Sequence, residues 1–365
     1  MALKCGIVGL PNVGKSTLFN ALTSAKALAA NYPFATKEPN VGIITVPDPR
    51  LDKLSELVNP QRVQPTTIEI LDIAGLIKGA SKGEGLGNQF LANIREVDAI
   101  IHVVRCFEDD NVVHVDGNVD PVRDKEIIDT ELIFKDIETV EKRLEKLRKE
   151  AKTGTKEAKK AVENAEYILS QLEEGLNARA IEMTDDQQEL VQSMMLLTSK
   201  PILYVCNVDE DSATTGNTHT EALKASVANE DAEVILVSAE IEYEISQLES
   251  KEERLEYLET MGLHEPGVNR LINSSYALLN LITYFTAGVK EVRAWTITKG
   301  TKAPQAAGVI HTDFEKGFIR AEVIHYEDFI HYGSEAAVKE AGKMGVEGKE
   351  YVVQDGDVMH FRFNV

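Results

Sequence analysis

The chain has 365 residues, 43 % of them hydrophobic, and its 60 acidic and 39 basic side chains give a formal net charge of −21. This length allows two or three domains, and the composition supports ordinary globular cores. The negative charge excludes a surface that attracts nucleic acid as a whole, so any contact with RNA must come from a local basic patch.

Apolar runs and cysteines indicate the cellular compartment. No apolar run approaches the roughly 18 residues of a membrane span, and the first nine residues predict a strand rather than a signal peptide. Cys5, Cys106 and Cys206 all lie within or at the ends of apolar runs, and none has metal-ligand spacing. An odd number of buried thiols suits a reducing compartment better than a disulfide framework. We therefore expect a cytoplasmic protein without membrane contact.

Residues 9–16, GLPNVGKS, have the pattern G-x-x-x-x-G-K-S of a phosphate-binding loop. Residues 3–9 predict a short buried strand before the loop, and residues 16–25 predict a helix after it. The glycines allow main-chain N–H groups to converge on phosphate oxygens, and the helix N-terminus adds a partial positive charge. An accidental glycine-rich turn is the alternative, but the order of strand, loop and helix argues against it.

Each residue of this loop has an expected role. Lys15 should reach the β- and γ-phosphates, and the Ser16 hydroxyl should ligate Mg²⁺. We assign contacts with the nucleotide phosphates to Asn12, Val13, Gly14, Lys15, Ser16 and Thr17.

Short apolar runs alternate with helical patterns in much of the chain, at residues 7–9, 66–75, 97–107, 201–207 and 233–240. This alternation predicts an α/β fold with a mostly parallel sheet covered by helices on both faces. Residues 41–47 fit an additional antiparallel strand near the sheet edge. A nucleotide should then bind at the carboxyl ends of the strands.

Residues 31–40, NYPFATKEPN, lie between the first helix and the second strand, where a switch loop is expected. Thr36 could reach both the metal and the γ-phosphate from this loop. Thr23 and Thr45 are less suitable because they lie on a predicted helix and a predicted strand. An ordinary surface threonine remains the alternative for Thr36.

The motif D-x-x-G follows a predicted strand at Asp72 and Gly75. Asp72 would hold Mg²⁺, through water, and the Gly75 N–H would contact the γ-phosphate. The glycine-rich residues 78–88 would then form the second switch segment.

The group that orients the attacking water is left open by the sequence. Related switch NTPases place a glutamine directly after D-x-x-G, but here the residue is Leu76, so slow intrinsic hydrolysis is expected. His114, in the loop after a predicted strand, is a candidate because histidine titrates near neutrality. An ordinary loop histidine is the equal alternative, and His102 is more typical of a core residue. Asn12 could help to hold a K⁺ ion between phosphate oxygens.

Residues 129–197 break the alternating pattern. Two long amphipathic segments separated by KTGTK predict an antiparallel helical hairpin that interrupts the sheet domain. Within it, residues 141–160 hold nine basic and four acidic side chains, a local charge of +5. This stretch is a candidate RNA contact, although a solvated helical face is the more common meaning of a charge run.

The strand over 201–207 ends in Asn207-Val208-Asp209-Glu210, where guanine-binding proteins carry N-K-x-D. A guanine-reading aspartate accepts two hydrogen bonds, and losing them costs on the order of 1–3 kcal/mol. Glu210 is longer and removes this clamp, Val208 could cover the ring, and the Asn207 amide could meet adenine N6 and N7. Ser238 and Ala239 would supply main-chain groups near the base. We therefore predict a preference for ATP over GTP.

The segment after residue 281 is rich in β-forming residues. Residues 292–300, 308–314, 318–326 and 357–365 predict strands, and residues 326–342 predict a helix. A small sheet packed on one helix, forming a separate α+β domain, is the natural interpretation.

Taken together, GLPNVGKST, NYPFAT, DIAGL, IKGASKGEGLGNQFL and NVDE resemble the YchF family of Obg-related ATPases, over essentially the whole chain. The resemblance implies a G domain over 1–128 and 198–280, a coiled-coil insertion over 129–197 and a TGS domain of β-grasp fold over 281–365. It also implies ATP preference, dependence on Mg²⁺ and association with the ribosome, through the large subunit or the 70S particle. We expect a monomer.

Two other functions are alternatives to a ribosome-associated switch ATPase. In one, the protein is an RNA-binding or stress-regulatory interaction protein for which nucleotide binding matters more than turnover. In the other, it is a small-molecule kinase, but the sequence offers no lid and no arginine cluster for a second substrate.

Overall fold

The computed structural model describes residues 3–24, 41–73, 86–114, 117–230 and 232–364. The chain forms two compact units, one of Met1–Ile44 with Glu69–Leu271 and one of Thr45–Ile68 with Ile272–Val365. The predicted helical segment thus groups with the first unit. Residues 45–68 group with the C-terminal unit, although the predicted division placed them in the G domain.

The first unit contains a six-stranded sheet in the order β2-β4-β1-β5-β6-β7. Its strands are β1 (Lys4–Val8), β2 (Val41–Thr45), β4 (Thr67–Asp72), β5 (Ala99–Arg105), β6 (Ile202–Asn207) and β7 (Glu233–Val237). The pairs β1–β4, β1–β5, β5–β6 and β6–β7 are all parallel. Every residue of β5 and β6 is buried, as expected of parallel strands covered on both faces. The predicted α/β architecture is confirmed, and β2 lies at the sheet edge.

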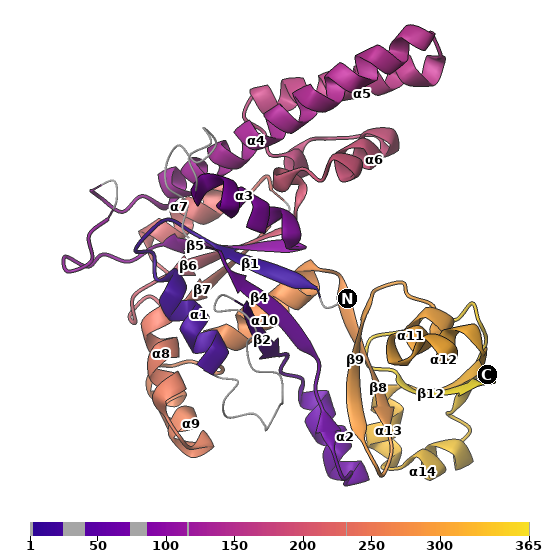
Figure 1. The fold of residues 1–365 in the computed structure, drawn as a ribbon. Helices are drawn as coiled ribbons and strands as arrows, with labels where there is room; N and C mark the ends of the chain where they lie inside the picture. Colours follow the sequence, from indigo (N-terminus) through magenta and orange to yellow (C-terminus); the bar gives the residue numbers. More distant parts are fainter. Residues whose placement is uncertain (1–2, 25–40, 74–85, 115–116, 231, 365) are drawn as a thin grey trace. The chain divides into compact units, whose positions relative to one another are not determined.

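Helices cover both faces of this sheet (Figure 1). On one side lie α1 (Lys15–Ser24) and α8 (Ala239–Gln247), which contact each other, and on the other lie α3 (Leu86–Glu96) and α7 (Thr218–Ser226). Two further helices, α9 (Lys251–Thr260) and α10 (Gly267–Leu278), follow in the chain. No helix in the described ranges is long and apolar enough to cross a membrane.

A helical arm extends from the sheet of the first unit (Figure 1). It is formed by α4 (Pro121–Glu150), α5 (Lys156–Glu173) and α6 (Asp185–Met194). The first helix begins at Pro121, where Asp120 accepts a hydrogen bond from the Arg123 N–H as N-cap, so it starts eight residues before the predicted boundary. Buried aliphatic side chains of α4 and α5, including Val140, Ile168 and Leu172, pack against each other along the hairpin.

The base of the arm buries four charged side chains that pair with one another. Lys125 and Asp129 of α4 are 2.7 Å apart, and Lys125 is also 2.7 Å from Glu230, which follows α7. Arg179, after α5, lies 3.1 Å from Glu230 and 3.5 Å from Asp129. Burial raises the Asp129 pKa, but Arg179 and Lys125 outweigh that effect, so its pKa is lowered. The two positive and two negative charges balance within this cluster.

The second unit is an α+β structure, as predicted. Its sheet has the order β11-β10-β12-β8-β9-β3. The strands are β3 (Val63–Gln64), β8 (Leu281–Ala287), β9 (Val292–Thr298), β10 (Phe318–Ile324), β11 (Gly345–Glu347) and β12 (Val358–Phe363). One buried cluster contains Tyr284 and Phe361, and a second contains Leu54 and Phe285.

The helices of the second unit correct two predictions. The expected strand over 308–314 is wrong, because α11 (Ala303–Ile310) and α12 (Thr312–Lys316) occupy this segment. The alanine-rich start of α11, with proline in its first turn, favours a helix, and three of its alanines are buried. The expected single helix over 326–342 is instead α13 (Tyr326–Tyr332) and α14 (Glu335–Glu340), separated at Gly333, whose φ is +75°.

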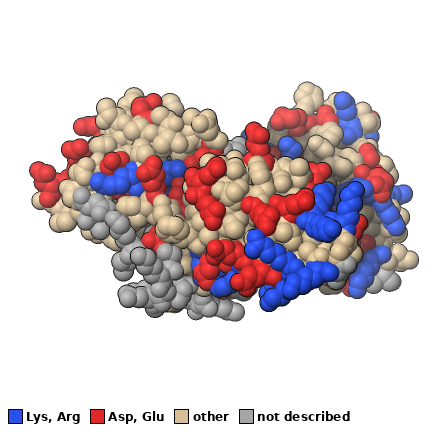
Figure 2. Space-filling model, turned by 90° about the horizontal axis from the view of Figure 1, so that it is seen from above, with Lys and Arg blue, Asp and Glu red and all other residues tan. Residues whose placement is uncertain are grey.

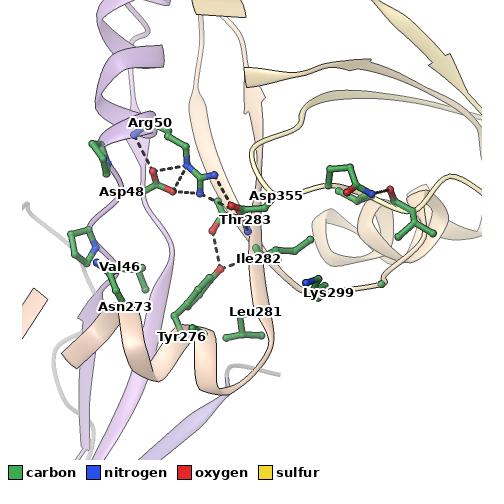
Figure 3. A pocket seen from close by; sticks show the side chains of 17 residues that line it. Val46, Asp48, Arg50, Asn273, Tyr276, Leu281, Ile282, Thr283, Lys299 and Asp355 are labelled. Carbon is green, nitrogen blue, oxygen red and sulfur yellow. Dashed lines mark hydrogen bonds and ion pairs between the residues drawn. The ribbon is translucent and has the colours of Figure 1, made fainter. Parts of the chain in front are cut away.

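A cavity of about 830 Å³ lies within the second unit, beside the start of α2 (Pro49–Val58) (Figure 3). Arg50 donates hydrogen bonds to Asp48 at 2.8 Å and to Asp355 at 2.7 Å. Asp355 in turn accepts a hydrogen bond from the Thr283 N–H. These bonds join the first turn of α2 to β8 and to the loop before β12.

Candidate functional site

The phosphate-binding loop connects β1 to α1 and has a backbone that only certain residues tolerate. Asn12 has a φ of +64° and Gly14 a φ of +89°. A Cβ atom on Gly14 would lie 2.1 Å from Asn207 Nδ2, and one on Gly9 would lie 2.7 Å from the Val103 carbonyl oxygen. Both glycines are therefore required by close approach, and Gly14 also by its backbone conformation.

Asn207, at the end of β6, joins this loop to the start of α8. Its Nδ2 donates to the Val13 carbonyl at 2.8 Å, and its Oδ1 accepts from the Ala239 N–H at 2.9 Å. The side chain is buried. These bonds use one N–H and one lone pair of the amide and position the loop, and the amide keeps a second N–H and a second lone pair, so its contact with adenine stays a prediction.

Lys15 and Asp72 form an ion pair at the start of α1. Both side chains are largely buried, whereas Ser16 beside them is exposed. The hydroxyl of Ser16 and the carboxylate of Asp72 are oxygen donors of the kind Mg²⁺ takes when substrate phosphates and water complete its coordination. The residues therefore fit a magnesium ion. Thr36, Gly75 and Leu76 lie outside the described residues.

A pocket of about 480 Å³ opens beside the phosphate loop. Four segments of the first unit line it, at the loop itself, after β5, after β6 and at the start of α8. The lining residues are Asn12, Gly14, Thr17, Phe107, Glu108, Asp109, Val112, Asn207, Val208, Asp209, Ala239, Glu240 and Tyr243. This volume lies in the range of small-ligand pockets, and the site is at the carboxyl ends of the parallel strands.

Three of the predicted base-contacting residues line this pocket, namely Asn207, Val208 and Ala239, whereas Glu210 and Ser238 do not. Glu210 is largely exposed. Its pKa is raised by partial desolvation and by the negative charge of Glu244. Ser238 is buried and caps α8 by accepting a hydrogen bond from the Ile241 N–H.

Two aromatic residues of the pocket, Phe107 and Tyr243, were missed by sequence reasoning. The position of Phe107 two residues after β5, and of Tyr243 one helical turn after Ala239, could have indicated them. Asn12 of the phosphate loop also contacts the segment after β5, because its Nδ2 donates a hydrogen bond to the Val113 carbonyl at 3.1 Å.

The surroundings of the His114 side chain differ from those expected of an ordinary loop residue. The side chain is buried, and its Nε2 lies 2.8 Å from Asp124 Oδ2 in the first turn of α4. His114 does not line the pocket beside the phosphate loop. In this conformation the ring is hydrogen-bonded to the start of the arm.

Two family models match the chain. Residues 4–136 match MMR_HSR1, described as a 50S ribosome-binding GTPase. Residues 281–364 match YchF-GTPase_C, described as a protein of unknown function. The chain is also similar in structure to the Schizosaccharomyces pombe YchF GTPase, with a TM-score of 0.89 and 43 % identity, covering 99 % of this chain and 97 % of that one.

Curated relatives match over their full length. The chain is 59 % identical over 371 residues to the ribosome-binding ATPase YchF of Bacillus subtilis strain 168 and 56 % identical over 365 residues to that of Escherichia coli O157:H7. Both alignments cover 100 % of each protein. Identity at this level from end to end, with a fold shared by the yeast protein, shows that this chain belongs to the YchF family.

Proposed function

We propose that this protein binds and hydrolyses ATP and, as a nucleotide-dependent switch, associates with the ribosome. The observation that carries the proposal is the pocket that runs from the phosphate loop to Val208 and Ala239. A base bound in this pocket would lie next to phosphates held by the loop. The relatives named ribosome-binding ATPases support both parts of the function.

Each residue of the phosphate site has a separate task in this proposal. Lys15 leaves Asp72 when a triphosphate binds and places its ammonium group on the β- and γ-phosphate oxygens. Ser16 and Asp72 hold Mg²⁺, and Thr36 and Gly75 contribute from the two switch segments. The ion supplies charge neutralisation on the phosphates. The main-chain N–H groups of residues 12–17 stabilise the negative charge of the bound phosphates.

The choice of base is tested by competition between ATP and GTP. Because Val208 and Glu210 stand where guanine-binding proteins carry lysine and aspartate, we expect wild-type protein to bind ATP more tightly than GTP. A variant with Val208→Lys and Glu210→Asp restores the guanine-reading pattern and should gain GTP affinity by about tenfold or more. Competition titrations with a fluorescent nucleotide measure both affinities. A double variant without any gain for GTP contradicts this account of base choice.

Hydrolysis by this chain should be slow, because Leu76 cannot hydrogen-bond to water. We propose that His114 orients the attacking water after it separates from Asp124. His114→Ala should then lower kcat by about 100-fold while leaving the Kd for ATP within twofold of wild type. Single-turnover hydrolysis and nucleotide titration give the two values. An unchanged kcat removes His114 from the mechanism.

A K⁺ ion near Asn12 is also proposed, and equal rates of hydrolysis in Na⁺ and K⁺ buffers would exclude it.

The surfaces that meet the ribosome are proposed from charge and resemblance. On the face shown in Figure 2, basic side chains form separate patches among acidic ones. The +5 stretch over 141–160, in the arm, is the basic segment that we assign to RNA. The arm would act as an insertion in the G domain, and residues 281–365 as a TGS domain, in a monomeric cytoplasmic protein. Co-sedimentation with 70S ribosomes and isolated large subunits, with and without ATP, tests the association.

A further inference from the structure

Arg105 is a buried arginine inside the first unit. It is the last residue of β5, and only 2 % of its surface is exposed. None of the ion pairs found among the described residues includes Arg105. A buried cation is costly unless its donors are satisfied, so the contacts that Arg105 makes instead require an explanation.

The guanidinium donates to three main-chain carbonyl oxygens of the segment that follows β5. Nε donates to Phe107 at 3.1 Å, Nη1 to Val112 at 2.9 Å and Nη2 to Asp109 at 3.2 Å. Its Cζ also lies 4.5 Å from the centroid of the Phe107 ring. One planar side chain thus satisfies three acceptors that point inward from a single turn of chain.

The segment that Arg105 supports is the same one that forms a wall of the pocket. Phe107, Glu108, Asp109 and Val112 all line it. The ends of this wall have other supports, because Asn217 Nδ2 donates to the Cys106 carbonyl at 2.7 Å and Asn12 Nδ2 donates to the Val113 carbonyl. Between Cys106 and Val113, Arg105 donates the hydrogen bonds to the carbonyls of Phe107, Asp109 and Val112.

We propose that Arg105 is a positioning residue for nucleotide binding, which fixes this wall against the base and ribose. The inference rests on the proposed function, since it assigns the pocket to a nucleoside. Arg105 itself lines no part of the pocket. It therefore acts on the affinity for nucleotide rather than on the chemical step. Because Lys15 does not line this pocket, the affinities for ADP and ATP should change together.

The test uses full-length protein with Arg105→Met, which fills similar space but donates no hydrogen bond, and Arg105→Lys, which can donate from one point only. Arg254→Met is the matched control. Arg254 also donates to a main-chain carbonyl, that of Leu248, from Nε at 3.0 Å, but it does not line the pocket. Calorimetric titration with ADP and with a non-hydrolysable ATP analogue gives the Kd and the number of sites, and steady-state hydrolysis gives kcat.

We expect Arg105→Met to raise the Kd for both nucleotides by about tenfold or more, equivalent to about 1.4 kcal/mol. Arg105→Lys should fall between this variant and wild type, and Arg254→Met should match wild type. All variants should keep one site per chain and a kcat at saturation within twofold of wild type. If Arg105→Met yields no folded protein, the Kd of Arg105→Lys decides the question against the same control.

Two results overturn the inference while leaving the proposed function intact. One is a Kd within twofold of wild type at full stoichiometry. The other is a reduced number of sites with an unchanged Kd, which is the signature of lost folded protein alone. Absence of nucleotide binding by the wild-type protein overturns the proposed function, and the inference with it.

Discussion

Replacing Gly14 by alanine should raise the Kd for ATP by at least about 100-fold. The new Cβ would lie 2.1 Å from Asn207 Nδ2, far inside contact distance. Asn207 cannot move away without releasing Val13 and Ala239, to which its amide is bonded. The clash therefore displaces the phosphate loop itself, and the N–H groups no longer converge on one point. Equilibrium binding of a fluorescent ATP analogue in the presence of Mg²⁺ measures the effect.

Gly154→Ala is the matched control for this variant. Gly154, in the turn between α4 and α5, has a φ of +81°, close to the +89° of Gly14, but a Cβ there would meet nothing within 4 Å. It carries the same backbone penalty of about 1 kcal/mol without the steric clash. Nucleotide binding by Gly154→Ala should equal that of wild type. If Gly14→Ala also binds ATP normally, Asn207 does not hold the loop as described.

Asp129→Asn should lower the free energy of unfolding of the first unit by about 3–5 kcal/mol. The substitution leaves Lys125 and Arg179 in a buried cluster with Glu230 as their remaining carboxylate. His102 adds no positive charge at pH 7, because burial lowers its pKa to about 4. The buried cluster is then left with one positive charge that no negative charge balances. Urea denaturation followed by circular dichroism gives the change in free energy.

A charge-balanced variant separates this effect from the loss of packing. Combining Lys125→Met with Asp129→Leu removes one charge of each sign and leaves Arg179 paired with Glu230 at 3.1 Å. Buried pairs replaced by apolar residues of similar size are often nearly neutral, so the double variant should be more stable than Asp129→Asn. An Asp129→Asn protein that unfolds at the same urea concentration as wild type would show that charge balance does not stabilise the base of the arm.

The parallel sheet could be predicted because its strands carry a local signal. The segments that became β5 and β6 are mostly apolar runs, which parallel strands need when helices cover both faces. The segment over 308–314 misled the same reasoning. Val309, Ile310 and Phe314 have strand propensity, but the buried alanines before them pack a helix against the sheet. Packing outweighed propensity there, as it does for short segments generally.

The candidate site shows the same difference between local signals, which the sequence carries, and contacts that tertiary packing decides. The amino-acid order of residues 9–16 was sufficient to identify a phosphate loop, because its glycines, lysine and serine act within one turn of chain. The partners of other side chains were decided only by folding. Asn207 meets Val13 across 194 residues, and His114 turns to Asp124 of the arm. Arg105 carries no motif at all, and its role follows from three carbonyl oxygens that the loop after β5 directs inward. Hydrogen bonds of this kind depend on where the backbone lies, which a linear pattern of residue types does not encode.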